Sequence, residues 1–574
     1  MKNIPLYEVD QISTLKDMII NSEKKFGDKP AFLKKVPGID NYVPVTYKQY
    51  KKDVDALGTK LIDLGYKDEK IVIIGENRYE WSCSYLAVVN GVGVVVPLDK
   101  ELPENEIELS VNRAEASLVI FSPKLIDKID NLYSKLPTVK EYIVMDDESS
   151  DDRFVAFGKL LKDGHELLDK GDDRFTSSEI DPEEMKILLF TSGTTDVAKA
   201  VMLSHRNICE NLMAMCSMTY IDENDVFLSI LPIHHTYECT CGFLCPLYRG
   251  STVAYCEGLR HIAKNMAEAK VTIVLGVPLV FESMYKKIWD GIRKAKQEKK
   301  VRFAIRLNNF LKILGMDKSK NMFEKIHASF GGHLRLLISG AAAIDPEVAK
   351  GFRDLGILFI QGYGLTECAP IVALNRNVDF KDAAAGLPMP GVDIVIDNPD
   401  ENGIGEIIVK GPNVMLGYYK DEAATKQVID SKGYFHTGDL GYMDKEKFVY
   451  ITGRKKNVIV TKNGKNIFPE EIEYLLLKSP YIQEVLVYAS DEAGDTIVKA
   501  NIFPNFEKIE EDFKNGVISS DNVEAIIQSE IKNVNKQLVN YKSIRGFNIR
   551  ETEFSKTTTR KIKRYVEENK VEND

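Results

Sequence analysis

Short apolar runs alternate with amphipathic segments through the first three quarters of the chain, and this pattern predicts alternating strands and helices. The runs typical of buried strands are residues 70–74, 93–96, 117–121, 271–275, 335–338 and 357–360. Strands that alternate with helices indicate α/β layers with largely parallel sheets. We therefore expect an α/β fold for most of the chain, with the acidic stretch 146–184 on its surface.

The pattern changes after residue 393 to short strands and turns, as in 405–410 and 448–452. Farther on, the spacing predicts a helix over 470–477 and a strand over 485–488, which together indicate a smaller α+β unit. A length of 574 residues also favours division, because single hydrophobic cores stop growing at roughly 250–300 residues. We predict domains at 1–453 and 458–574, joined by a hinge at 454–457.

The overall composition is that of an ordinary globular protein, with 44% apolar and 28% charged residues. A formal net charge of −10 argues against general nucleic-acid binding, which usually requires a basic face. No run approaches the roughly 18 consecutive apolar residues of a membrane span, and the amino-terminal segment lacks a signal-peptide pattern. These features predict a cytoplasmic protein.

Segment 286–320 reverses the overall charge, with twelve Lys or Arg residues against three acids. Apolar residues such as Phe303 and Phe310 are interleaved with the cations. A solvated helix face is one interpretation. The other is peripheral contact with anionic membrane lipid or with an amphiphilic substrate.

Three of the eight cysteines, Cys239, Cys241 and Cys245, lie just after His234 and His235. A metal site is one interpretation of this cluster. Paired C-x-x-C motifs are absent and the surrounding residues become apolar, so we favour small core cysteines on a buried helix.

A loop of small hydroxyl residues follows the apolar run 187–190, and it reads Thr191, Ser192, Gly193, Thr194 and Thr195. Such a loop lets backbone N–H groups and hydroxyls surround a phosphate, and Lys199 adds a positive charge. Taken alone, the loop is also compatible with an ordinary turn.

Five further motifs with nucleotide-binding chemistry follow in order, at 339–343, 362–367, 434–439, 453–456 and 556–561. Small residues in the first allow a flat ring to lie against backbone, and the second offers an aromatic face, a hydroxyl and a carboxylate. The third exposes an acid suited to a ribose diol, and the last two supply cations. Together they favour an adenine nucleotide.

With these motifs in this order, the chain resembles the adenylate-forming superfamily of acyl-CoA synthetases, luciferases and adenylation domains. Within it, the chain looks most like AMP-forming long-chain fatty acid–CoA ligases, on ENRYEW at 76–81, LPIHHTYE at 231–238 and KGPNVMLGYY at 410–419. The resemblance implies a large N-terminal domain with two α/β-layered subdomains and a distorted β-barrel. It also implies a small, mobile α+β C-terminal domain.

The resemblance implies a role for each matching position on ATP. The 191–195 loop and Lys199 would hold the β- and γ-phosphates, Thr366 would contact the α-phosphate, and Glu367 would bind Mg²⁺. The residues that would hold the adenosine are Gly340, Ala341, Ala342, Tyr363, Gly364, Asp439 and Arg454.

The resemblance also implies the catalytic and hinge positions. Lys561 would meet the acyl carboxylate and the α-phosphate, and His235 would lie beside that carboxylate. Gly464 would line the approach of the CoA thiol, and Lys456 lies where the family hinges. A carboxylate is already ionised at neutral pH, so its attack on phosphorus needs charge neutralisation rather than a general base.

The phosphate loop departs from the family pattern at Asp196, Ala198 and Ala200, and the lysine-bearing loop departs at Ser555 and Arg560. Since Lys199 and Lys561 are kept, we expect these differences to affect ATP affinity rather than reaction type. Apolar segments 231–247 and 271–285, the second bent at 276–278, are candidate walls for the acyl chain.

The expected reaction converts a fatty acid, ATP and CoA into acyl-CoA, AMP and pyrophosphate, with Mg²⁺. One alternative is an acyl-AMP ligase or acyl-carrier-protein synthetase that delivers the acyl group to a carrier-protein phosphopantetheine. Another is a non-catalytic nucleotide-binding protein on the same fold. Because CoA and carrier protein end in the same thiol, the motifs leave the acceptor open.

Overall fold

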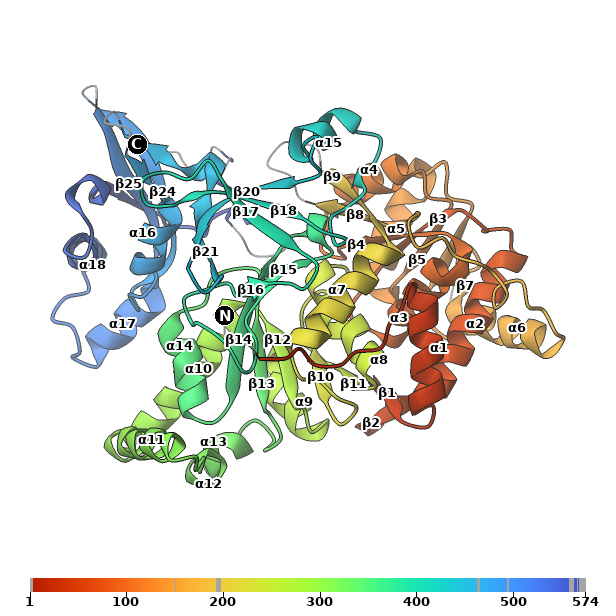
Figure 1. The fold of residues 1–574 in the computed structure, drawn as a ribbon, viewed down its shortest axis with the longest axis horizontal. Coiled ribbons are helices and arrows are strands. Elements are labelled where there is room, and N and C mark those ends of the chain that lie inside the picture. The colour runs from red at the N-terminus through yellow and green to blue at the C-terminus, as the bar shows by residue number, and fades with distance from the viewer. Residues whose placement is uncertain are drawn as a thin grey trace.

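The computed structural model describes residues 4–149, 151–191, 198–461, 465–492, 495–556, 562–564 and 566 (Figure 1). Two large sheets and a layer of helices between them form most of the molecule. A smaller group of strands and helices, coloured blue, lies at one end.

The first large sheet has eight strands and a parallel centre. Its order is β19 (Gly417–Tyr418), β9 (Lys199–Ser204), β8 (Met185–Thr191), β4 (Val94–Leu98), β3 (Lys70–Ile74), β5 (Leu118–Phe121), β6 (Glu141–Val144) and β7 (Val155–Ala156). β3, β4, β5 and β6 are parallel, whereas β8 and β9 form an antiparallel pair. The central strands are buried on both faces, which explains their uninterrupted apolar sequences.

The second large sheet has nine strands. Its order is β16 (Leu387–Pro388), β15 (Ile371–Leu374), β14 (Leu358–Gly364), β13 (Leu336–Ser339), β12 (Ile273–Gly276), β10 (Val226–Ser229), β11 (Thr252–Tyr255), β1 (Pro30–Val36) and β2 (Ile39–Thr46). The run from β1 to β14 is parallel, so the carboxyl ends of β12, β13 and β14 lie at one edge.

Helices form three layers around these sheets. The core between the sheets contains α1 (Leu15–Phe26), α2 (Tyr47–Asp63), α3 (Tyr79–Ala87), α7 (His205–Met218), the π-helix η4 (Tyr237–Leu244) and α8 (Cys245–Arg249). The outer face of the eight-stranded sheet is covered by α4 (Glu104–Ala114) and α5 (Ile126–Leu132). The outer face of the nine-stranded sheet is covered by α9 (Ile262–Glu268), α10 (Pro278–Lys294) and α14 (Pro346–Asp354).

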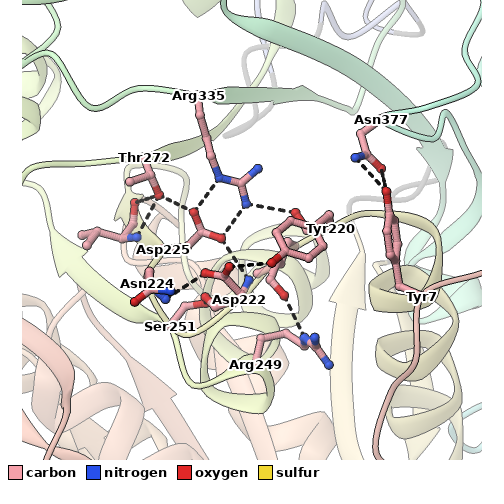
Figure 2. A network of polar contacts seen from close by, with 12 residues as sticks. Tyr7, Tyr220, Asp222, Asn224, Asp225, Arg249, Ser251, Thr272, Arg335 and Asn377 are labelled. Atoms are coloured by element: carbon pink, nitrogen blue, oxygen red, sulfur yellow. Dashed lines mark hydrogen bonds and ion pairs between the residues drawn. The ribbon is translucent and has the colours of Figure 1, made fainter.

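An ion pair between buried Asp225 and half-buried Arg335 ties together the amino ends of three parallel strands (Figure 2). Arg335, just before β13, donates to both carboxylate oxygens of Asp225, at 2.7 and 2.5 Å. Asp225 precedes β10, and it also accepts the hydroxyl of Thr272, just before β12, at 2.7 Å. The network fixes this end of the sheet and leaves the carboxyl ends for the functional site.

Residues 393–454 fold as a four-stranded antiparallel sheet. Its order is β17 (Asp393–Asp397), β18 (Gly405–Lys410), β20 (Phe435–Met443) and β21 (Val449–Arg454), with α15 (Glu422–Val428) beside it. β18 coincides with the predicted strand. Among the described strands this sheet is open, and a closed barrel stays a prediction.

The small C-terminal domain has its own hydrophobic core. Its sheet contains β24 (Ile482–Glu492), β25 (Asp495–Pro504) and β26 (Ile544–Ile549), packed with α16 (Pro469–Leu476), α17 (Phe506–Lys514) and α18 (Val523–Asn535). A short pair, β22 (Ile459–Val460) and β23 (Asn466–Ile467), precedes it. The predicted α/β fold with a large N-terminal and a small α+β C-terminal domain is confirmed, while the boundaries at 453 and 458 stay predictions.

The acidic stretch predicted at the surface lies largely there, since most of its described residues are exposed or half-buried, but part of it is anchored in the core. The acidic stretch 146–184 contains α6 (Phe157–Asp169), which packs on α2. Phe157, Leu160 and Phe175 are buried, and Phe175 lies where a side chain at Gly58 would be. The many acids of this stretch concealed a few large apolar residues that are sufficient to anchor it.

The remaining helices are α11 (Glu298–Ile313), α12 (Ser319–Met322) and α13 (Glu324–Ala328), at the lower edge of the molecule in Figure 1. Among the helices of the described residues, none is long and apolar enough to cross a membrane.

Candidate active site

A cleft of about 3680 Å³ opens where the carboxyl ends of β12, β13 and β14 face β20, β21 and the small domain. The described residues of the predicted site all line it: Thr191, Lys199, His235, Gly340, Ala341, Ala342, Tyr363, Gly364, Thr366, Glu367, Asp439, Arg454 and Lys456. The other predicted positions, Ser192, Gly193, Thr194, Thr195, Gly464 and Lys561, lie outside the described residues. Ligand sites are typical at this edge of an open α/β sheet.

Gly340 follows β13 directly and approaches the ring of Tyr237 closely. A Cβ at this position would lie 2.8 Å from Cζ of Tyr237, closer than real Cβ contacts. The Tyr237 hydroxyl donates to the carbonyl of Ile338 at 2.9 Å, which holds the ring in place. The Gly340–Ala342 segment therefore gives the cleft a flat wall of backbone and small side chains.

Tyr363, near the end of β14, is joined to a cross-strand ion pair. Its hydroxyl donates to Oδ2 of Asp439 at 2.6 Å, and Nε of Arg454 lies 2.6 Å from Oδ1 of the same carboxylate. The register of β20 and β21 places Asp439 opposite Arg454. Burial, with Asp439 beside it, raises the pKa of the Tyr363 phenol well above its usual range, so the phenol stays protonated.

Lys199, Tyr418 and Glu367 form a second group that lines the cleft. The hydroxyl of Thr191 donates to the carbonyl of Lys199 at 3.2 Å across the β8–β9 hairpin. Nζ of Lys199 lies 4.6 Å from the ring centre of Tyr418, and the Tyr418 hydroxyl donates to Oε1 of Glu367 at 3.0 Å. A cation near the centre of one aromatic ring and a carboxylate at its hydroxyl thus line the cleft together.

His234, His235 and Asp99 cluster near the start of η4. The two imidazole rings lie 4.3 Å apart, and Nε2 of His234 lies 3.5 Å from Oδ2 of Asp99. Burial, followed by the neighbouring His235, lowers the pKa of His234 to about 3 despite Asp99. His234 is therefore a neutral imidazole at physiological pH.

Glu238, one turn farther along η4, is a buried carboxyl group that lines the same cleft. Its Oε1 accepts the hydroxyl of Ser229 at 2.6 Å. Burial nevertheless raises the pKa of Glu238 to about 8, so this group is protonated near neutral pH.

The predicted hinge contacts both domains. Lys455 pairs with Glu406 of β18 at 2.8 Å, and Asn457 donates to Glu470 of α16 at 2.6 Å. Burial, and then the neighbouring Arg454, lowers the pKa of Lys456. At these hinge residues the large and small domains are therefore joined by polar contacts.

Two functional candidates escaped sequence reasoning. Tyr418 stands at the end of the 410–419 motif, but its link to Lys199 and Glu367 depends on how β19 pairs with β9. Glu238 belongs to the 231–238 motif, but its elevated pKa depends on burial. No sequence pattern predicts either the contacts of Tyr418 or the elevated pKa of Glu238.

The cysteine prediction is confirmed, because Cys239, Cys241 and Cys245 are buried free thiols within η4 and at the start of α8. None of these cysteines is within the possible metal-binding group of the described residues Asp99, His234 and His235.

Comparison with known proteins agrees with this geometry. A family model described as AMP-binding enzyme matches residues 21–419. The long-chain-fatty-acid–CoA ligase 1 of Cavia porcellus is 30% identical over 545 residues, covering 88% of this chain and 75% of that protein. A chloroplastic long-chain-fatty-acid–[acyl-carrier-protein] ligase of Arabidopsis thaliana is 26% identical over 562 residues, covering 86% and 76%.

The fold is also that of a solved structure, the anthranilate CoA ligase AuaEII in complex with anthranoyl-AMP. The TM-score is 0.75 at 20% sequence identity, and 98% of each chain is covered. The predicted resemblance to adenylate-forming enzymes is thus confirmed, and with it the prediction of an enzyme. On the match over residues 21–419 and the 30% identity to a relative across most of its length, this chain belongs to the AMP-binding enzyme family.

Proposed function

We propose that this protein is an AMP-forming acyl-CoA ligase, which activates a long-chain fatty acid with ATP and transfers the acyl group to CoA. The observation that carries the proposal is the convergence on one cleft of the Lys199–Tyr418–Glu367 group and the Tyr363–Asp439–Arg454 network. The first suits a triphosphate and the second suits a nucleoside. The relatives named as long-chain fatty acid–CoA ligases support the substrate class.

In this proposal the cleft holds ATP along its length. Tyr363 stacks against the adenine, which lies on the Gly340–Ala342 wall with Gly364 beneath it. The Asp439 carboxylate accepts the ribose hydroxyls, and Arg454 holds that carboxylate in position. The triphosphate extends toward Thr366, Lys199 and the 191–195 loop.

Glu367 suits Mg²⁺, because a half-buried carboxylate facing the cleft is the hard oxygen ligand that this ion prefers. The Tyr418 hydroxyl donates to Oε1 and so orients the carboxylate. When bound, the ion would neutralise phosphate charge as pyrophosphate departs.

The acyl carboxylate is already an anion, so the protein must overcome its repulsion from the triphosphate. We assign Lys561 to the carboxylate and the α-phosphate, and His235 to the side of the cleft where the acyl group enters. Apolar residues of 231–247 and 271–280 line the cleft nearby, including Leu231, Leu275 and Val277, and they suit an alkyl chain.

The second half-reaction transfers the acyl group from acyl-AMP to a thiol. We propose that the small domain rotates about 454–457, which brings Gly464 to the thiol channel in place of Lys561. Domain rotation about a few residues is a recurrent device for exchanging catalytic groups.

The test is pyrophosphate release that depends on added fatty acid. Lys561→Ala should lower this release by ~100-fold or more, as expected for removal of a charge-stabilising group, whereas Lys536→Ala, at an exposed position after α18 of the small domain, serves as a matched control. Equal turnover by wild type and Lys561→Ala would refute the assignment of Lys561. A profile of acids from short to long chains then measures the length preference.

A second acceptor has a specific observation in its favour, since one relative is named as an acyl-carrier-protein ligase. Incubation with CoA or with carrier protein, followed by product mass, separates the two. We also propose that segment 286–320 brings the protein to a membrane surface, the source of its amphiphilic substrate.

A further inference from the structure

Helix α11 packs through a mixed face, in which polar residues lie beside half-buried apolar residues such as Val301 and Ile305. Among the described residues of α11, Asn308 is the fully buried one, and its Nδ2 donates to Oγ of Ser319 at 2.8 Å. Asn309 donates to Asp354 of α14 at 3.0 Å, and Lys312 donates to the carbonyl of Arg353 at 3.1 Å. Hydrogen bonds therefore contribute to the anchoring of this helix.

The opposite face of α11 is an exposed apolar stripe, defined as Phe303, Leu307, Phe310 and Leu314. These residues are 67%, 40%, 59% and 57% exposed. Their spacing of four, three and four positions places them on one side of a helix. Two phenylalanines exposed together on one helix face mark an interaction surface rather than scattered surface residues.

Cations border the stripe. Lys299, Lys300 and Arg306 are exposed, and each lies beyond ion-pair distance of every acid in the described part of the chain. The surrounding segment 286–320 carries twelve Lys or Arg residues against three acids, although the whole chain carries −10. Charge and apolar surface thus coincide on the same helix.

We propose that this face of α11 docks on a bilayer that contains anionic phospholipid. The apolar stripe would enter the boundary between headgroups and acyl chains, while the bordering cations contact phosphate groups, as in interfacial amphipathic helices. A second copy of this chain fits poorly, because a symmetric interface would set the same cations against one another.

Helix α10 contacts the cleft with one half and α11, which carries the docking face, with the other half. Residues in the first half of α10, including Pro278 and Glu282, line the cleft. Arg302 of α11 instead lies over Trp289, in the second half of α10, at 4.8 Å. Docking through α11 therefore leaves the nucleotide cleft accessible. The benefit of docking, delivery of a membrane-dissolved fatty acid, rests on the proposed function.

Sedimentation of the full-length protein with vesicles tests the docking directly. One set contains equal parts phosphatidylcholine and phosphatidylglycerol, and the other contains phosphatidylcholine alone. We expect binding to the first set, weaker binding at high salt, and at most weak binding to the second. The double variant Lys299→Glu, Arg306→Glu should bind at least ~10-fold more weakly, at roughly 1 kcal/mol per lost cation.

Matched variants separate docking from general charge and from folding. Lys159→Glu, Lys162→Glu makes the same charge change at exposed positions on α6, and it should bind vesicles like wild type. Phe303→Ser, Phe310→Ser should lose vesicle binding but keep its melting temperature, because both side chains are already exposed.

Equal vesicle binding by wild type and both α11 variants overturns the proposal. So does a dimer in vesicle-free solution that the Phe303→Ser, Phe310→Ser variant converts to monomer, since the stripe would then be a protein interface. Turnover of a soluble short-chain acid distinguishes the two proposals. Vesicle binding without turnover supports docking and counts against the ligase activity. Turnover without vesicle binding supports the ligase activity and counts against docking.

Discussion

The buried carboxyl of Glu238 should make the large domain less stable as the pH rises. Its pKa is raised from 4.5 to about 8, because burial outweighs the Ser229 hydroxyl and the Leu231 backbone, which favour the charged form. The unfolded chain releases this proton near the ordinary pKa, whereas the folded chain keeps it to about pH 8. Between these values the folded state binds more protons, so the free energy of unfolding falls with rising pH.

The size of the effect follows from the two pKa values. At about 1.4 kcal/mol per pKa unit, the shift from 4.5 to about 8 lowers the free energy of unfolding by about 4 to 5 kcal/mol between low pH and pH values above 8. Glu238→Gln keeps the shape of the side chain and its contact with Ser229 but has no proton to release. Its stability relative to wild type should therefore increase by about 3 to 4 kcal/mol between about pH 5 and about pH 9.

Urea unfolding followed by tryptophan fluorescence measures this difference. The chain has two tryptophans, and in a Trp289→Phe background Trp81 remains, with its ring 6.3 Å from Phe243 of η4. Glu166→Gln, at an exposed position on α6, is the control and should follow the wild-type profile. Parallel pH profiles for Glu238→Gln and wild type would refute the assignment of a buried, protonated Glu238.

Three further predictions concern the sheet and the cleft. Arg335→Met leaves the Asp225 carboxylate buried without its cation and should lower the free energy of unfolding by about 3 kcal/mol, and adding Asp225→Asn should recover most of that loss. Gly340→Ala places a Cβ 2.8 Å from Cζ of Tyr237, so calorimetry should show weaker AMP binding, while Gly291→Ala, with no atom within 4 Å, should bind normally. Unchanged affinity in Gly340→Ala would contradict the adenine wall. Arg454→Met removes the cation 2.6 Å from Asp439 and should raise the Kd for AMP by ~10-fold or more. The control Lys445→Met, at an exposed position, should leave that Kd unchanged. Equal Kd values in the two variants would rule out the role of Arg454.

The elements that the sequence predicted well are those whose pattern is local. The strand at 405–410 is exact, and the helix at 470–477 is displaced by one residue, to Pro469–Leu476. The strand expected at 271–275 begins two residues later, at Ile273, and Thr272 instead donates its hydroxyl to Asp225. Strand ends depend on such tertiary contacts, which a single sequence does not display.

In the candidate site, likewise, the sequence identified single residues, whereas their contacts and burial depend on tertiary structure. Motifs identified Tyr363, Asp439 and Arg454 separately. The pairing of β20 with β21 joins Asp439 to Arg454, and the Tyr363 hydroxyl reaches Asp439 from β14. The burial that protonates Glu238 comes from packing of a π-helix between two sheets, and helical periodicity alone gave no sign of it. The packing of α11 buries Asn308, a polar residue that a composition-based interpretation assigns to solvent.

The position of Arg454 has a consequence for the energetics of domain rotation. It is the last residue of β21, it is fixed to Asp439 of the large domain, and the proposed hinge continues directly from it. A nucleoside held by these two residues would keep the same contacts in both orientations of the small domain. A ligand with equal affinity for two conformations shifts neither population, however tightly it binds. The adenosine would thus supply affinity alone, and the choice between the two orientations would fall to groups such as Lys561, whose proposed contact with the α-phosphate would exist in only one of them.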